Sequence, residues 1–90
     1  YDTCAFVGIF LKEASSFEDT IRKLQTVPEI TELHFTTGQY DLLIKIYARD
    51  NDHLLHLIHD KLQPMGLLRT ETIVSFREVF SRALPVDSPD

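Results

Sequence analysis

The sequence is 90 residues long, which corresponds to one domain that can bury an ordinary core without disulfides or metal. Hydrophobic residues make up 43% of it and charged residues 26%, a composition typical of soluble globular proteins. Nine Lys and Arg against fourteen Asp and Glu give a net charge of −5, which disfavours direct DNA binding because nucleic-acid binders usually carry a basic patch. A single Cys4 fits a reducing, cytoplasmic setting. No apolar run approaches the ~20 residues that span a bilayer, so no membrane contact is expected.

The first third of the chain predicts a strand and then a helix. Residues 3–12 form a continuous apolar run, as expected for a buried central strand. Ser15 and Glu18 have capping-box spacing, and apolar residues then recur at helical intervals. We therefore expect a helix over about 16–26, which ends before Pro28.

Two strands and a second helix are expected next. Residues 30–37 alternate between apolar and polar, which predicts a half-buried or edge strand, whereas 40–48 are strongly apolar and predict a central strand. Asn51 or Asp52 is in place to cap the second helix. Its apolar positions are Leu54, Leu55, Ile58 and Leu62, and it is expected to end near Pro64 and Gly66.

The last part of the chain predicts one further strand and a tail. Residues 67–76 alternate again, and 78–83 are expected to add a short terminal strand. Residues 84–90 are acidic, contain proline and are expected to form a flexible tail. Residues 1–83 are thus the expected domain.

This order of elements, βαββαβ, predicts an α+β protein of the ferredoxin-like type. Such a fold is a sandwich of one antiparallel four-stranded sheet with two helices on one face. The first and third strands are the most apolar, which is consistent with their occupying the middle of the sheet.

The pleat of the first strand predicts self-association. Ala5, Val7, Ile9 and Leu11 point to one face, and Cys4, Phe6 and Phe10 to the other. Two helices can cover only one of these faces, and soluble monomers rarely leave a contiguous apolar face open. We therefore expect a homodimer that stacks sheet on sheet about a two-fold axis.

The histidines allow metal or catalytic interpretations, but simpler ones are favoured. On a helical wheel His53, His56 and His59 fall on one polar arc, and no cysteine or carboxylate cluster completes a metal site there. A solvated helix face is the better interpretation, so we predict no metal and no cofactor. His34 lies mid-strand, where a half-buried structural role is favoured over that of a general base. Common enzyme signatures are absent, which favours a non-enzyme.

Residues 36–41, with the sequence TTGQYD, predict a polar hairpin between two strands. Gly38 can supply a positive φ, and the segment offers hydroxyls, an amide, a phenol and a carboxylate. Thr70 and Thr72 share one face of the last strand. If both sets face one cleft, backbone N–H groups near Gly38 could hold a carboxylate and Asp41 an ammonium group, which suits a zwitterionic amino acid. The alternative is a plain β-turn.

Three segments, taken together in chain order, resemble a known family. They are the opening Tyr1-Asp2 with the strand Ala5-Phe6-Val7-Gly8-Ile9, the hairpin 36–41 with the apolar strand after it, and the late strand Arg69-Thr70-Glu71-Thr72-Ile73-Val74. Over roughly residues 1–83 the chain resembles the C-terminal effector (RAM) domain of the Lrp/AsnC, or feast/famine, transcriptional regulators.

The resemblance implies a dimeric α+β barrel that senses a small effector, usually an amino acid, and often assembles into octamers of four dimers. By position it makes Gly38, Gln39, Tyr40, Asp41, Thr70 and Thr72 the effector-contact candidates. DNA binding would come only through an N-terminal helix-turn-helix domain, which these 90 residues lack. The start at Tyr1 without Met favours truncation over a stand-alone effector domain. The alternative from another class is a small dimeric α+β barrel enzyme, a monooxygenase or isomerase, that uses His34.

Overall fold

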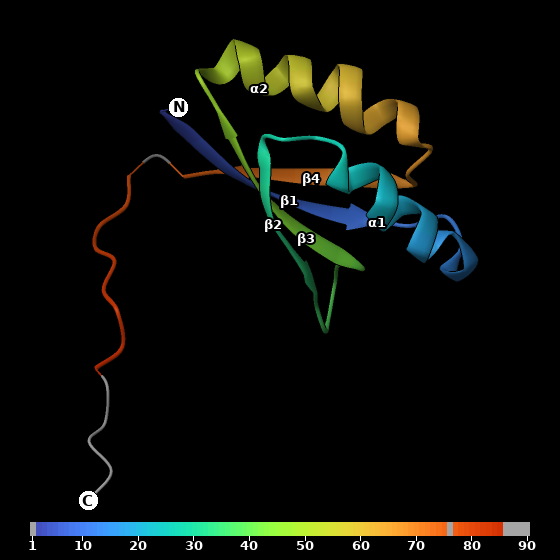
Figure 1. The fold of residues 1–90 in the computed structure, drawn as a ribbon, viewed down its shortest axis with the longest axis horizontal. Helices are drawn as coiled ribbons and strands as arrows, with labels where there is room; N and C mark the ends of the chain where they lie inside the picture. The colour runs from blue at the N-terminus through green and yellow to red at the C-terminus, as the bar shows by residue number, and fades with distance from the viewer. Residues whose placement is uncertain (1, 76, 86–90) are drawn as a thin grey trace, which may run out of the picture.

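The computed structural model describes residues 2–75 and 77–85, in which four strands and two helices follow the expected βαββαβ order (Figure 1). This confirms the ferredoxin-like α+β fold. The elements are β1 (Thr3–Phe10), α1 (Phe17–Gln25), β2 (Ile30–Phe35), β3 (Leu42–Ala48), α2 (Asn51–Leu57) and β4 (Arg69–Val74).

The sheet has the strand order β2-β3-β1-β4, and every neighbouring pair is antiparallel. The two most apolar strands, β1 and β3, are therefore central, as the sequence predicts. In the register, Val7 lies opposite Ile44 on one side and Thr72 on the other. The strands β2 and β4 form the two edges.

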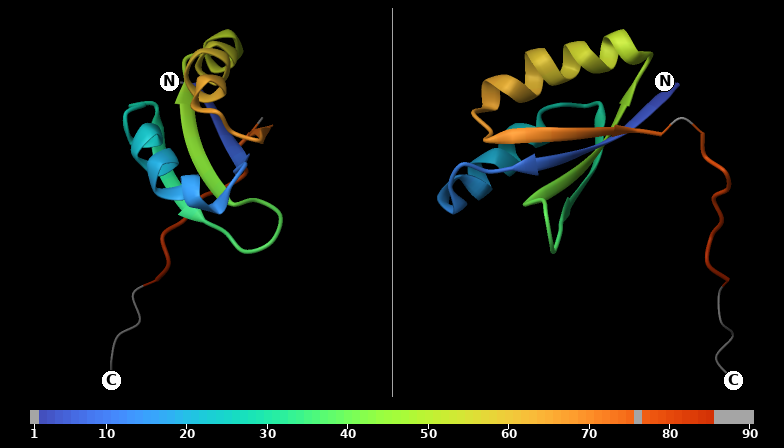
Figure 2. Two further views of the ribbon diagram at one scale, coloured as in Figure 1. Left: turned by 90° about the vertical axis from the view of Figure 1, so that its right-hand side faces the viewer. Right: turned by 180° about the vertical axis from the view of Figure 1, so that it is seen from behind.

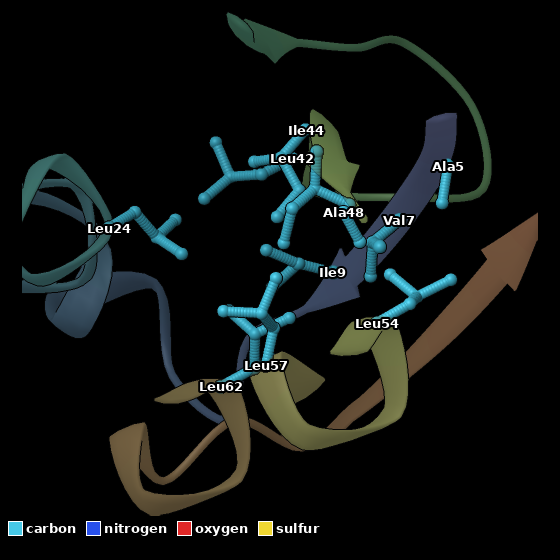
Figure 3. Close-up of a cluster of buried hydrophobic side chains, with 11 residues drawn as sticks. Ala5, Val7, Ile9, Leu24, Leu42, Ile44, Ala48, Leu54, Leu57 and Leu62 are labelled. Carbon is cyan, nitrogen blue, oxygen red and sulfur yellow. The ribbon is translucent and has the colours of Figure 1, made fainter. Parts of the chain in front are cut away.

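Both helices cover the same face of the sheet, and the core lies between these two layers (Figures 2 and 3). Leu24 reaches the core from α1, and Leu54 and Leu57 reach it from α2. Burying one Leu or Ile side chain contributes about 1.5–3 kcal/mol, so this layer is the main source of stability. The strand residues of the core are Ala5, Val7, Ile9, Leu42, Ile44, Ile46 and Ala48, each fully buried.

The other face of the sheet, which we call the open face, carries aromatic rings and cations. The Lys45 Nζ lies 5.8 Å from the centre of the Phe6 ring and 5.4 Å from that of Tyr47. The Arg69 Cζ lies 4.2 Å above the Phe10 ring. Within the described chain no helix covers these residues, which matches the expectation from the pleat of β1.

Both helix caps differ from the sequence-based expectation. The Ser15 hydroxyl donates to the Glu13 carboxylate at 3.2 Å, and no side chain caps α1, so the predicted capping box with Glu18 is wrong. Residues Ala14–Ser16 instead form a short 3₁₀ turn that leads into the helix. Asp50, not the predicted residue 51 or 52, caps α2, because its carboxylate accepts the His53 N–H at 2.8 Å.

After Leu57 the second helix changes geometry. Residues Ile58–Leu62 form a π-helical turn and Gln63–Met65 a 3₁₀ turn, and Gly66 ends the segment with φ +74°. The predicted end near Pro64 and Gly66 is confirmed. The prediction that Leu55 belongs to the apolar face is wrong: Leu55 is 64% exposed, and Leu57 is buried in its place.

The segment that follows β4 contains no strand over residues 77–85, so the predicted terminal strand at 78–83 is wrong for the isolated chain. The segment runs away from the body of the domain (Figure 1). Residues 1, 76 and 86–90 lie outside the described part, and most of the expected tail falls there. Over the described residues, no helix is long and apolar enough to cross a membrane.

Candidate functional site

The hairpin at residues 36–41 is closed by its own polar groups. The Thr36 hydroxyl donates to the Tyr40 carbonyl at 2.9 Å. Gly38 has φ +102°, which confirms the expected positive φ and explains why glycine suits this place. Thr37, Gly38 and Gln39 are exposed at the tip.

Asp41 fastens the hairpin to the end of β1. Its backbone N–H donates to the Ile9 carbonyl at 3.0 Å, and its carboxylate Oδ2 accepts the Leu11 N–H at 2.8 Å. One carboxylate oxygen thus holds the point where β1 leaves the sheet for α1. The other oxygen, Oδ1, accepts no hydrogen bond among those found in the described residues and can meet a ligand.

Asp41 also borders a hollow of ≈ 500 Å³ at this end of the sheet. Small-molecule sites are typically about 300–1,000 Å³ in volume, so an amino acid fits in size. The Phe17 ring, one wall of the hollow, stacks on Phe35 with ring centres 4.5 Å apart. The lining residues are Leu11, Ala14, Ser15, Phe17, Glu18 and Asp41, an apolar set with two carboxylates and no Lys or Arg.

Tyr40 turns to the open face of the sheet. Its ring lies on the backbone of Gly8 in β1, so closely that a side chain at Gly8 would overlap it. The ring also meets Phe10 edge-on, with centres 5.4 Å apart. Glu71 on β4, first by a side-chain hydrogen bond and then by its charge, raises the pKa of the Tyr40 phenol, and burial raises it further.

Thr70 and Thr72 lie on the opposite face from the Tyr40 ring. The register pairs them with Ile9 and Val7, whose side chains are buried on the helix side. Within one chain the six predicted contact residues therefore do not line a single cleft. Asp41 and Thr70 flank Ile9 from its two sides, which places this pair at the same end of the sheet.

The histidines differ in their exposure and in the groups that they contact. His34 has a side chain that is 54% exposed, and its Nε2 lies 2.9 Å from the Glu32 carboxylate, as a half-buried, hydrogen-bonded role implies. This contact is the main reason that the pKa of the Glu32 carboxyl is lowered. The side chain of His53 is only 15% exposed and accepts the Arg49 N–H at 3.0 Å, so it does not share a solvated arc with the other two. No cluster of three metal-ligating side chains occurs among the described residues.

Comparison with known proteins shows to which family this chain belongs. Residues 4–85 match the family model of the Lrp/AsnC ligand binding domain. The chain belongs to the Lrp/AsnC family. Its relatives are named as transcriptional regulators, a family that is not enzymatic. This contradicts the alternative of an enzyme that uses His34.

Individual relatives confirm the fold. Regulatory protein AsnC of Escherichia coli is 34% identical over 85 residues, which cover 93% of this chain and 56% of that protein. Its solved structure matches with a TM-score of 0.89, over 93% of this chain and 57% of that chain. The chain thus spans about half the length of the curated relatives it matches.

Two further structures are similar. PHS023 from Pyrococcus horikoshii is 26% identical with a TM-score of 0.75, over 86% of this chain and 93% of that one. The regulator NMB0573 of Neisseria meningitidis, solved as a complex with L-Met, has a TM-score of 0.84 over 93% of this chain and 56% of that one. At 22% identity this last likeness concerns the fold alone.

Sequence reasoning missed two parts of this site. The first is the contact of Gly8 and Glu71 with Tyr40; a lone glycine within a strand was the available signal, because it often marks a close approach. The second is the hollow beside Asp41, whose walls come from the 3₁₀ turn and α1. No spacing in the sequence indicates that these segments converge.

Proposed function

We propose that this chain is the ligand-sensing and oligomerisation domain of an Lrp/AsnC-type transcriptional regulator. It binds a small amino acid or a related metabolite at a subunit interface, and binding modulates assembly and DNA binding by the intact protein. The observation that carries the proposal is the hollow beside Asp41 in a chain that matches a ligand-binding domain.

The chemistry of the hollow suits the ammonium end of an amino acid. The Oδ1 atom of Asp41 and the nearby Glu18 carboxylate favour a cation, and Leu11 and Phe17 provide apolar contact for a side chain. The fold neighbour NMB0573 is described as an L-Met complex, which supports an amino acid as the class of effector.

A second subunit is the natural source of the missing half of the site. The lining residues include no Lys or Arg, so the carboxylate of an amino acid lacks a charged partner in one chain. Tyr40 turns to the open face, and Thr70 and Thr72, although they lie on the helix face, are not among the residues that line the hollow. A ligand held between subunits reaches such groups, with backbone N–H groups near Gly38 as further donors.

Binding at an interface gives a mechanism for regulation. A ligand that contacts two subunits binds better to one assembly than to another, and so shifts the equilibrium between them. The basic assembly is a homodimer through the open face, and four such dimers form an octamer. DNA is bound through a helix-turn-helix domain outside this chain, and the regulator acts in the cytoplasm.

A thermal-shift screen of the twenty amino acids at millimolar concentration tests the sensor function. At least one should raise the melting temperature, because a ligand that binds only the folded state stabilises it. No shift with any of them contradicts the proposal.

Asp41→Asn provides the specific control. The Asn side-chain oxygen can still accept the Leu11 N–H, but the charge for an ammonium group is gone. A charge-assisted hydrogen bond is worth about 1.5–3 kcal/mol, so the affinity for the amino acid should fall ~10-fold or more while the unliganded melting temperature is retained. The exposed Gln25→Ala is the matched variant that should change neither quantity.

A further inference from the structure

Residues 77–85 extend beyond β4 with large apolar side chains in solvent. Val79 is 75% exposed, Phe80 71% and Leu84 89%. The base of this segment is anchored, because the Ser75 N–H donates to the Cys4 carbonyl at 3.1 Å. Figures 1 and 2 show the segment leaving the sheet and pointing away from both helices.

The segment is part of the domain and not an appendage to it. The family match extends through residue 85. The match to the E. coli AsnC structure covers 93% of the chain, more than residues 2–75 alone supply. A recurring part of a domain that makes so little contact within its own chain is expected to make contact with another.

The segment has the properties of an added strand. Alternation places Phe80 and Leu84 on the same face of an extended chain, a face that can bury both. Pro85 has no N–H to donate, so strand pairing ends there. Arg77 and Glu78 line a hollow of ≈ 340 Å³ with Cys4 and Lys45, so the segment starts on the open-face side of the sheet.

The edge strand β2 offers a surface along which residues 77–84 can pair. Its outer backbone groups have no strand beside them in the described chain. Glu32 of β2, whose side chain is 45% exposed and contacts His34 and Lys45, is opposite in charge to Arg77 and Arg82 of the segment, which also carries Glu78. Six residues of β2, Ile30–Phe35, suit the length of residues 77–84.

The β2 strand of the same chain is out of reach on the far edge, because the order is β2-β3-β1-β4. A two-fold axis that runs along the strands of two stacked sheets places the β4 edge of one copy over the β2 edge of the other. The segment that continues from β4 then meets β2 of the second copy.

We propose that residues 77–84 form an arm that pairs as a fifth strand along β2 of a second copy and buries Phe80 and Leu84 there. This inference rests on the face-to-face dimer of the proposed function. It adds to that dimer a reciprocal exchange of arms, which covers the β2 edge of each copy.

Disulfide cross-linking between two chains tests the arm. In a Cys4→Ser background, Ser81→Cys is placed in one chain and Thr31→Cys in a second chain that carries a size tag. After mild oxidation of the mixture we expect the mixed-size covalent dimer. His59→Cys, on the exposed side of the second helical segment, replaces Thr31→Cys as the control and should give at most one-tenth of that product.

A second measurement uses the dimer dissociation constant from sedimentation. Because Phe80 and Leu84 are exposed in the single chain, replacing both with Ser should leave its fold intact and weaken the dimer at least ~10-fold. Ser81→Ala, on the other face of the arm, is the matched control. Dimers whose affinity is unchanged and whose cross-linking equals that of the control overturn the arm alone. A chain that stays monomeric overturns both the arm and the proposed assembly.

Discussion

The ring of Tyr40 lies on the backbone of Gly8, in the space that a Cβ atom at Gly8 would occupy. The contact joins the hairpin to the central strand of the sheet, and on the other side of the same hairpin Asp41 holds the end of β1. The hollow, in which we propose that a ligand binds, and the open face are therefore connected through the adjacent residues Asp41 and Tyr40. This gives a physical route from a bound effector to the surface through which we propose that subunits associate.

Gly8→Ala should destabilise the domain by about 1–3 kcal/mol, because the new methyl group overlaps the ring and forces it to move. In a Tyr40→Ala background the same substitution should be close to neutral. A double-mutant cycle by urea unfolding measures the coupling. Equal costs of Gly8→Ala in both backgrounds would show that the ring contact does not restrict this position.

Asp41→Ala should lower the free energy of unfolding by about 0.5–1.5 kcal/mol, because the Leu11 N–H loses its acceptor. Asp41→Asn should retain most of that stability. Chemical denaturation of the two variants separates the structural role of Asp41 from its charge. If Ala and Asn cost the same, the hydrogen bond to Leu11 is not the source of the stability.

Asp50→Ala should cost about 0.5–2 kcal/mol, because it removes the cap of α2. The adjacent Asn51→Ala is the matched control and should cost little, although the sequence favours Asn51 or Asp52 as the cap. Thermal unfolding of both variants decides the assignment. A larger loss at Asn51 than at Asp50 would contradict the cap seen here.

Tyr40 should titrate above the usual tyrosine pKa of 10.0, because its hydrogen bond with Glu71 and the charge of that carboxylate favour the neutral phenol. The folded-state pKa is raised, so this stabilisation is fully present below the unfolded pKa of about 10 and is lost as the pH rises through the folded pKa. NMR titration of the Tyr40 Cζ gives the value. Glu71→Gln should lower this pKa and Glu78→Gln should leave it in place; no response to Glu71→Gln would contradict the contact.

Much of the fold was predictable because burial and periodicity are local signals. The apolar runs of β1 and β3 predict their central places, and the pleat of β1 predicts that one of its two apolar faces stays uncovered by helices, without specifying which. The phase of α2 was not predictable in the same way, since Leu55 and Leu57 are both apolar. Leu57 lies three residues after the buried Leu54 and shares its face, whereas Leu55 is turned about 100° from Leu54 and faces solvent.

The site was predictable in its composition but not in its geometry. The hairpin residues stand together in the sequence, and Asp41 does border a hollow. Which face Tyr40 takes depends on space over Gly8, 32 positions earlier in the chain, and on Glu71 in the last strand. Such contacts depend on the register between strands, which spacing within one segment does not specify.

Sedimentation velocity with and without the amino acid that stabilises the chain is the most direct test of ligand sensing through assembly. The account predicts that this amino acid changes the dissociation constant of an association step, and that Asp41→Asn abolishes the change while the unliganded association stays the same. An amino acid that binds the chain but leaves every association constant unchanged would contradict it.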